Sequence, residues 1–169
     1  PRHDVSSLSM AIALVGLSHL ESLVMTATLK KGVPQFHHKN LDSAAFWGTA
    51  ALRGVLARDL AKRLCPARTV ECFTAGFLQD LAVPFLISQR PDEYGPILDA
   101  WHAGNTDFSN AERERFDWDH AQVATWIAQD WELPESLASA IGGHHSPDDA
   151  AYDCPLPVAL VANLSDTSE

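Results

Sequence analysis

The chain has 169 residues, of which 46% are hydrophobic and 20% are charged, and this suits one globular domain. Its 22 acidic and 12 basic residues give a net charge of -10, a field that would repel the phosphate backbone of a nucleic acid. No apolar run approaches the roughly 20 residues that a membrane span needs, and no signal-peptide pattern is present. We therefore expect neither a nucleic-acid partner nor a membrane partner.

The cysteine usage favours a cytoplasmic protein. Cys65, Cys72 and Cys154 are an odd number of cysteines and show no CxxC spacing, which is typical of reduced thiols. The chain begins at Pro1 rather than at a methionine, which is consistent with a piece of a longer protein.

Capping residues, apolar periodicity and Gly or Pro breaks predict helices along the whole chain. The first two are expected at about residues 7–16 and 18–29, followed by a loop at 33–41. A long helix is predicted from Asp42 to about Leu64, and its inner face is expected to carry Leu52, Val55, Leu56 and Leu60. Further helices are expected at 71–88, at 91–103, from a capping box at 109–112, and at 119–131, 133–141 and 156–165. No segment shows convincing strand alternation, so the predicted fold class is all-α.

The stretch Glu71–Ser88 is expected to form the centre of the fold. Its apolar residues recur at steps of three and four, at Val70, Phe73, Phe77, Leu78 and Leu81. Gly76 would let another backbone come close, at a cost of roughly 1 kcal/mol against Ala. Pro84 is expected to interrupt the helix and to start a new one as its first residue. Helix 119–131 is expected to present Val123, Ile127 and Trp131 on one side.

Asp80, His120 and the pair His144-His145 are the candidates for chemistry, with His19, His37, His38 and His102 as weaker ones. Imidazoles and a carboxylate gathered from separate helices suit a transition metal and could form a hydrolytic centre. No two candidates show an HExxH-like spacing. On spacing alone we favour the plainer interpretation, in which these side chains satisfy one another or backbone groups.

The order of motifs resembles that of the HDOD family (HD-related output domain), a bacterial signalling branch of the HD superfamily. The residues that carry this resemblance are Ser7–Gly16, Phe46-Trp47, Phe73–Leu81, Asp119-His120, Trp131–Pro134, Ala140-Ile141, His144–Pro147 and Pro157–Ala159 leading to Ala162-Asn163. The resemblance implies an HD-like helical bundle over residues 1–169 that lacks the family's N-terminal helices.

Three departures from the catalytic HD pattern affect the expected function. By resemblance, Thr49, Gln79 and Asn163 stand where a catalytic HD enzyme has His, His and Asp. Gln and Thr are poor ligands for a transition metal, and the loss of a carboxylate weakens the hold on a dication. The resemblance therefore implies a remnant HD site made of Thr49, Gln79, Asp80, His120, His144, His145 and Asn163, with no catalytic residue, no metal and no cofactor.

Three functions are compatible with these observations. We favour a non-catalytic signal-transduction output or scaffold domain in the bacterial cytoplasm, bound to a protein partner or to a fused sensor or receiver domain. The alternative is a metal-dependent phosphohydrolase acting on a nucleotide or cyclic dinucleotide. The third is a helical structural module with no small-molecule site.

Two expectations concern geometry. Asp80 should lie close to at least one of His120, His144 and His145, because a lone buried carboxylate is costly. Trp126 lies one residue from the Val123–Ile127 stripe, where it could belong to a partner-binding patch or merely fill a gap between helices.

Overall fold

The computed structural model describes residues 16, 20, 24, 27–28, 31–34, 36–39, 41–162 and 164. The expected helix at 7–16 therefore lies outside the described residues, apart from Gly16. Within residues 1–32, which form a compact unit of their own, Leu20 N donates to Gly16 O at 3.1 Å and Thr28 Oγ1 donates to Val24 O at 2.8 Å. The Leu20 bond has the backbone i to i−4 pattern of a helix, and the Thr28 hydroxyl reaches the carbonyl one turn earlier, both in agreement with the helix expected at 18–29.

The second unit, from Val33 onward, opens with a small hairpin where the sequence predicts a loop. Strand β1 (His37–His38) pairs antiparallel with β2 (Leu41–Asp42), with His37 opposite Asp42. Ser43 closes the hairpin, since its Oγ accepts from Phe36 N and donates to Phe36 O, both at 3.0 Å. Two-residue strands carry too little periodicity to be recognised from sequence.

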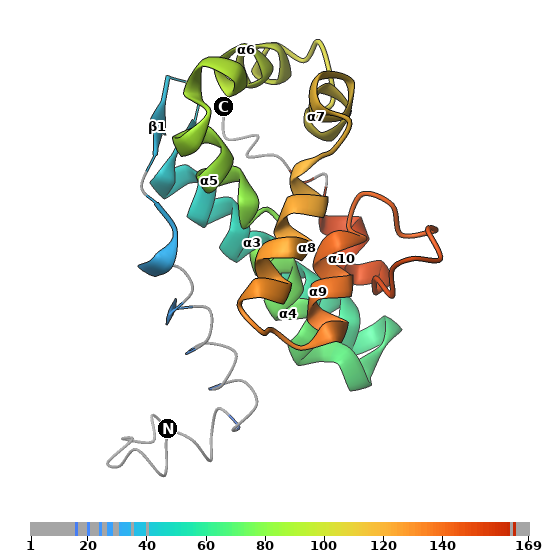
Figure 1. The fold of residues 1–169 in the computed structure, drawn as a ribbon. Helices are drawn as coiled ribbons and strands as arrows, with labels where there is room; N and C mark the ends of the chain where they lie inside the picture. The colour runs from blue at the N-terminus through green and yellow to red at the C-terminus, as the bar shows by residue number, and fades with distance from the viewer. Residues whose placement is uncertain are drawn as a thin grey trace, which may run out of the picture. The chain divides into compact units, whose positions relative to one another are not determined.

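Helices make up most of the rest of this unit among the described residues, so the predicted all-α, HD-like class is confirmed (Figure 1). In chain order they are α3 (Ser43–Leu64), the 3-10 turn η1 (Pro66–Arg68), α4 (Thr69–Leu78), α5 (Ala82–Gln89), α6 (Pro91–His102), α7 (Phe108–Phe116), α8 (His120–Asp130), α9 (Glu135–Gly142) and α10 (Leu156–Ala162). Helix α4 contacts α3, α9 and α10, while α5 bridges from α6 to α8.

Helix α4 is central and largely buried, as predicted. Its buried residues are Cys72, Thr74, Ala75, Gly76, Phe77 and Leu78. The chain leaves the helix at Leu78, earlier than expected, and α5 begins at Ala82. Pro84 is the third residue of α5 rather than its first, a position in the first turn where the missing N–H has no intrahelical acceptor to lose.

The inner face predicted for α3 is wrong. Leu52, Val55 and Leu56 are 51%, 37% and 36% exposed, and Leu60 is half-buried. The face toward the core instead carries small residues: Ala50, Gly54, Ala57 and Ala61, besides Phe46 and Trp47 near its start. They are selected by the close approach of α4, because a Cβ on Gly54 would lie 2.9 Å from Phe73 O and one on Gly76 would lie 3.0 Å from Ala57 Cβ.

Helix α8 shows the same exchange of large residues for small ones. The stripe expected at Val123, Ile127 and Trp131 is only half-buried. The fully buried side chains of the helix are His120, Ala121, Ala124 and Ala128. Alanines thus mark the contact faces of both α3 and α8, since helix axes approach most closely where side chains are small.

One stretch, Pro66–Gln89, is long and apolar enough to cross a membrane by length and composition, contrary to the expectation that no such run exists. Most of it is buried inside the protein. It contains η1, α4 and α5, with a turn at residues 79–81. A core helix passes the same test, so this stretch is weak grounds for a membrane span.

Candidate functional site

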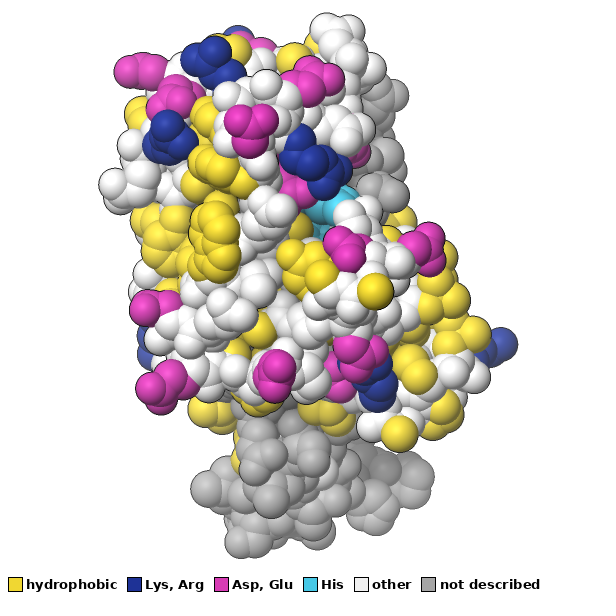
Figure 2. Space-filling model, turned by 45° about the vertical axis from the view of Figure 1, so that its right-hand side comes forward, with side chains coloured by type: hydrophobic (Ala, Val, Ile, Leu, Met, Phe, Trp, Pro, Cys, Tyr) yellow, Lys and Arg dark blue, Asp and Glu magenta, His cyan; other side chains and the backbone are white. Residues whose placement is uncertain are grey.

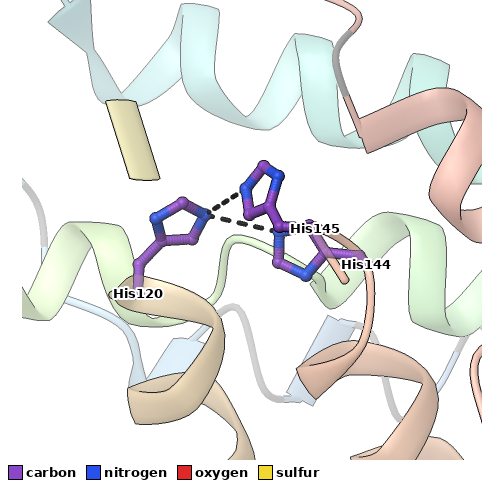
Figure 3. A group of neighbouring side chains, drawn as sticks. All are labelled: His120, His144 and His145. Carbon is purple, nitrogen blue, oxygen red and sulfur yellow. Dashed lines mark hydrogen bonds between the residues drawn. The ribbon is translucent and has the colours of Figure 1, made fainter. Parts of the chain in front are cut away.

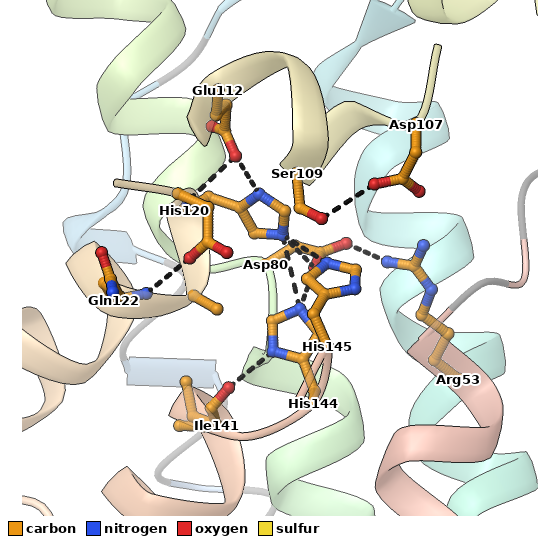
Figure 4. A network of polar contacts seen from close by, with 12 residues as sticks. Arg53, Asp80, Asp107, Ser109, Glu112, His120, Gln122, Ile141, His144 and His145 are labelled. Carbon is orange, nitrogen blue, oxygen red and sulfur yellow. Dashed lines mark hydrogen bonds and ion pairs between the residues drawn. The ribbon is translucent and has the colours of Figure 1, made fainter. Parts of the chain in front are cut away.

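Four of the predicted site residues converge on one point, as Figure 4 shows. His120 Nε2 and His144 Nε2 each lie 3.5 Å from Asp80 Oδ1, and His145 Nε2 lies 3.0 Å from His120 Nε2. The prediction that Asp80 contacts a histidine across helix boundaries is therefore confirmed. Asp80 stands in the turn between α4 and α5, His120 is the first residue of α8, and His144 and His145 follow α9.

The turn after α9 delivers His144 and His145 to the cluster because two glycines let it pack tightly. A Cβ on Gly142 would lie 2.2 Å from Thr125 Oγ1, and one on Gly143 would lie 2.7 Å from Cys154 Cβ. His144 is 2% exposed, and its Nδ1 lies 2.5 Å from the carbonyl oxygen of Ile141. That contact requires a proton on Nδ1, so in the neutral imidazole the Nε2 lone pair points into the cluster.

Glu112 is a site residue that the sequence analysis missed. Its fully buried carboxylate accepts from Tyr94 Oη at 2.8 Å and from His120 N at 2.9 Å, and it lies 2.5 Å from His120 Nδ1. The sequence places Glu112 in a capping box that begins at Ser109, and this is wrong. Asp107 caps α7 instead, accepting from Asn110 N at 3.1 Å, which leaves Glu112 free to orient His120.

Arg53 is the second residue that was missed. Its Nη1 forms an ion pair with Asp80 Oδ2, and its Nε donates to Leu164 O at 3.1 Å (Figure 4). The inner face predicted for this helix from sequence does not include Arg53. Its position one helical turn after Thr49 is the signal that could have placed it on the site face.

The charges of the site alternate along a chain of four side chains from Arg53 through Asp80 and His120 to Glu112. Burial alone would raise the pKa of Asp80, but the Arg53 guanidinium and a hydrogen bond from His120 hold it well below its usual range. Burial likewise disfavours a charged His120, yet bonds to Asp80 and Glu112 raise its pKa to about 10. Two cations therefore balance two carboxylates.

His145 has the opposite electrostatic character. Burial, together with the neighbouring His144 and His120, lowers the pKa of His145 to about 2. A neutral His145 accepts the proton that His120 carries on Nε2, across the 3.0 Å between the two nitrogens. The three imidazoles therefore meet at His120 Nε2, which lies 3.3 Å from His144 Nε2 and 3.0 Å from His145 Nε2 (Figure 3).

A polar pocket of about 340 Å³ opens beside the histidines. Its walls include His144, His145, Ser109, Asn110 and Arg113. Figure 2 shows a small area of histidine surface visible between basic and acidic side chains on this face. Arg113 is engaged by the N-cap carboxylate of Asp119 and donates to Ser109 Oγ at 2.9 Å.

The family follows from a match that covers most of the sequence. The HDOD domain model matches residues 1–147, which include Asp80, His120 and both histidines of the pair. The chain belongs to the HDOD domain family. The resemblance found from the motifs is confirmed.

Three solved structures are similar to this chain in fold and sequence. A proposed phosphohydrolase from Shewanella amazonensis SB2B is 25% identical with a TM-score of 0.78, and an HDOD domain protein of unknown function from Geobacter sulfurreducens is 24% identical with a TM-score of 0.76; both alignments cover 94% of this chain. The MmoQ response regulator from Methylococcus capsulatus str. Bath is 26% identical, covering 86% of this chain with a TM-score of 0.54. None of the curated proteins matches the chain.

This HDOD chain spans only part of the length of those proteins: 57% of the Shewanella protein, 53% of the Geobacter protein and 57% of MmoQ. The likeness to the Geobacter protein, below 25% identity, concerns the fold alone.

The remaining predicted site residues of the HDOD chain do not join the network. Thr49 is half-buried on α3 and makes no hydrogen bond to the cluster among the described residues. Gln79 is 1% exposed, and within the described part of the chain neither its Oε1 nor its Nε2 has a hydrogen-bond partner.

Asn163 and His19 lie outside the described residues. His38 instead contacts Asp99, with 3.8 Å between Nε2 and Oδ1, and His102 is exposed at the end of α6.

Three imidazoles are the groups in the described residues that could hold a metal ion. One nitrogen of each of His120, His144 and His145 lies within 4.8 Å of the others. The donor set does not fit an HD-type dication, however, because the Arg53 guanidinium already pairs with Oδ2 of Asp80, the carboxylate beside the imidazoles. An uncharged amide at Gln79 adds no anionic ligand.

Proposed function

We propose that this HDOD chain is a non-catalytic signal-transduction output or scaffold domain that binds a protein partner or a fused sensor or receiver domain in the bacterial cytoplasm. One observation carries the non-catalytic part: the guanidinium of Arg53 is paired with Asp80, the carboxylate that would otherwise bind a metal. The family and the response regulator among the similar structures support the signalling part. That residues 1–169 form one HDOD-like domain remains a prediction.

The cluster serves as a structural clasp in this proposal. It joins α3, the α4–α5 turn, α7, α8 and the segment after α9 through charged and polar contacts alone. A buried network that is fully paired stabilises one arrangement of helices over others. A signalling domain needs a defined surface more than it needs a reactive site.

The surface that we propose for the partner is centred on Trp126 of α8. Trp126 is 58% exposed, which argues against its filling a gap between helices. Exposed aromatic side chains often contribute much of the binding energy at protein interfaces. A photo-crosslinking residue at position 126 of the full-length protein should therefore join it to another domain or protein, whereas the same residue at exposed Lys62 should not. Equal crosslinking at both positions would contradict the patch.

The non-catalytic proposal is tested with metal and substrate together. The purified chain, reconstituted with Mn, Fe, Ni or Zn, should retain no stoichiometric metal and should not hydrolyse mononucleotides or cyclic dinucleotides. Catalysis of that kind requires several ligands that act on the dication together. Turnover that disappears in Asp80→Ala would overturn the proposal.

A matched set of variants isolates the role of Arg53. Arg53→Met should bind more divalent metal than the wild type because it frees the Asp80 carboxylate, whereas Arg53→Lys and the exposed Arg63→Met should not. Circular dichroism checks that each variant is folded. Equal metal content in the wild type and in Arg53→Met would mean that the guanidinium does not stand in for a cation.

A metal-dependent phosphohydrolase is the second candidate. Two observations favour it: the three converging imidazoles, and the similarity to the Shewanella protein named as a proposed phosphohydrolase. It predicts metal-dependent turnover that is lost on substitution of His144 or His145.

A further inference from the structure

Two thiols meet at the corner where α3 gives way to α4. Cys65 Sγ and Cys72 Sγ are 3.9 Å apart. Cys65 is the residue that follows α3 and precedes Pro66, and Cys72 lies in the first turn of α4. No disulfide joins them, so both sulfurs are thiols in contact.

The two thiols differ in access. Cys65 is half-exposed, whereas Cys72 is completely buried. Burial and the neighbouring Cys65 raise the pKa of Cys72 to about 12, so a thiolate does not form there first. A small oxidant can reach Cys65. The Cys72 thiol, which would react with the oxidised Cys65, is already in van der Waals contact with it.

We propose that Cys65 and Cys72 are a modification site that forms a reversible disulfide when the protein meets a hydroperoxide. The Cys65 thiolate attacks the peroxide, an S–O bond forms, the O–O bond breaks, and the alcohol or water leaves with a proton. Cys72 sulfur then attacks the sulfenic sulfur of Cys65, the S–S bond forms, and the oxygen leaves as water with the Cys72 proton. Two thiols are oxidised and one hydroperoxide is reduced; a dithiol restores the pair.

The local backbone permits the sulfurs to close. Cys65 lies outside both helices, with φ −150° and ψ 71°, so its side chain can move without breaking a helix. The sulfurs, now 3.9 Å apart, must approach to about 2 Å for the bond to form. Cys154, the third thiol, contacts Pro155 O at 3.7 Å instead, so it is a natural control.

The consequence of the bond is mechanical. The disulfide would link the C-terminal end of α3 to α4. Helix α3 carries Arg53 in its middle, and α4 leads into Asp80. The inference is independent of the proposed function, since it concerns a different corner of the fold.

The test uses the full chain, reduced and then treated with hydrogen peroxide under native conditions. Peptide mass spectrometry without reduction should find residues 65 and 72 joined with the loss of two hydrogens, and dithiothreitol should reverse this. Cys154→Ser should behave like the wild type. In Cys72→Ser, dimedone should trap Cys65 as a sulfenic acid, and in Cys65→Ser the buried Cys72 should remain an unmodified thiol.

Three results would overturn the inference. Both thiols could remain open to alkylation in unfolding buffer after peroxide treatment, or Cys65 could pair with Cys154. Overoxidation of Cys65 without any linkage to Cys72 would also contradict it, because the buried partner is required to intercept the sulfenic acid.

Discussion

Asp80 is stable in a half-buried site because two cations reach it from opposite sides. Arg53 approaches one carboxylate oxygen, and His120 and His144 lie 3.5 Å from the other. Removing one member of a desolvated charge pair costs more than the pair itself contributes, because the partner is left unpaired. Substitution of Asp80 should therefore destabilise the fold.

Asp80→Ala should lower the free energy of unfolding by about 1–3 kcal/mol, because it leaves both Arg53 and His120 without their shared acceptor. Chemical denaturation of the folded variant measures this. Asp59→Ala on the exposed face of α3, where the carboxylate pairs with Lys62, is the matched control and should change nothing within error. An Asp80→Ala protein as stable as the control would show that the cluster does not hold the helices together.

Glu112 sets the charge of His120 from the other side of the ring. Glu112→Gln keeps the size and the contact with Tyr94 but removes the negative charge that lies 2.5 Å from His120 Nδ1. The pKa of His120, now raised to about 10, should fall, and imidazole NMR titration follows it directly. Glu114→Gln, exposed on the same helix, is the control. An unchanged His120 titration would assign the shift to Asp80 alone.

At the scale of helices, the contact between α3 and α4 depends on the absence of side chains. Gly54 faces Phe73 O and Phe77 Cβ, which would lie 2.9 and 3.2 Å from an added Cβ. Gly48 lies on the same helix with nothing within 4 Å of an added Cβ. The two glycines therefore differ in packing and not in helix propensity.

Substituting each glycine by alanine separates these effects. Gly48→Ala should stabilise the protein by up to about 1 kcal/mol, because Ala is the better helix former. Gly54→Ala gains the same propensity but must push α4 away, and should be destabilising overall. Thermal unfolding of both variants compares them. A Gly54→Ala protein as stable as Gly48→Ala would mean that the helices can separate at little cost.

The same pair of helices shows what sequence can predict. The ends of most helices follow from caps and breaks such as Asp119 and Gly104, because these are local. The inner face of α3 does not, because periodicity weights Leu above Ala, whereas a close helix crossing requires Ala and Gly. Whether a helix crosses closely is decided by its partner, which local patterning does not contain.

The site divides in the same way. Asp80, His120, His144 and His145 follow from motif order, since the family pattern records which distant residues meet. Arg53 and Glu112 do not, because a charged side chain on a helix is usually solvated and their burial depends on each finding a partner across the fold. Trp126 is exposed although its flanking stripe is half-buried, which sequence alone left open.

For the molecule as a whole, the cluster should give stability a maximum near neutral pH. His120 binds a proton more tightly when folded, since its pKa rises from 6.5 to about 10; its contribution is complete below 6.5 and is lost as pH rises toward 10. His145 behaves oppositely, since its pKa falls from 6.5 to about 2; unfolding takes up a proton there, so stability is lost as pH falls below 6.5.

Denaturation across a pH series should therefore give a curve with an acid and an alkaline limb, and His145→Gln should flatten the acid limb between pH 6.5 and about 4. Below that range the low pKa of Asp80 adds its own loss as its carboxylate is protonated. The slope, and not the absolute stability, is the readout, because the substitution also changes packing. His102→Gln, at an exposed position on α6, should leave the slope unchanged. If both variants keep the wild-type acid slope, the pKa of His145 is not lowered in the folded protein, and His145 does not act as the neutral acceptor for His120.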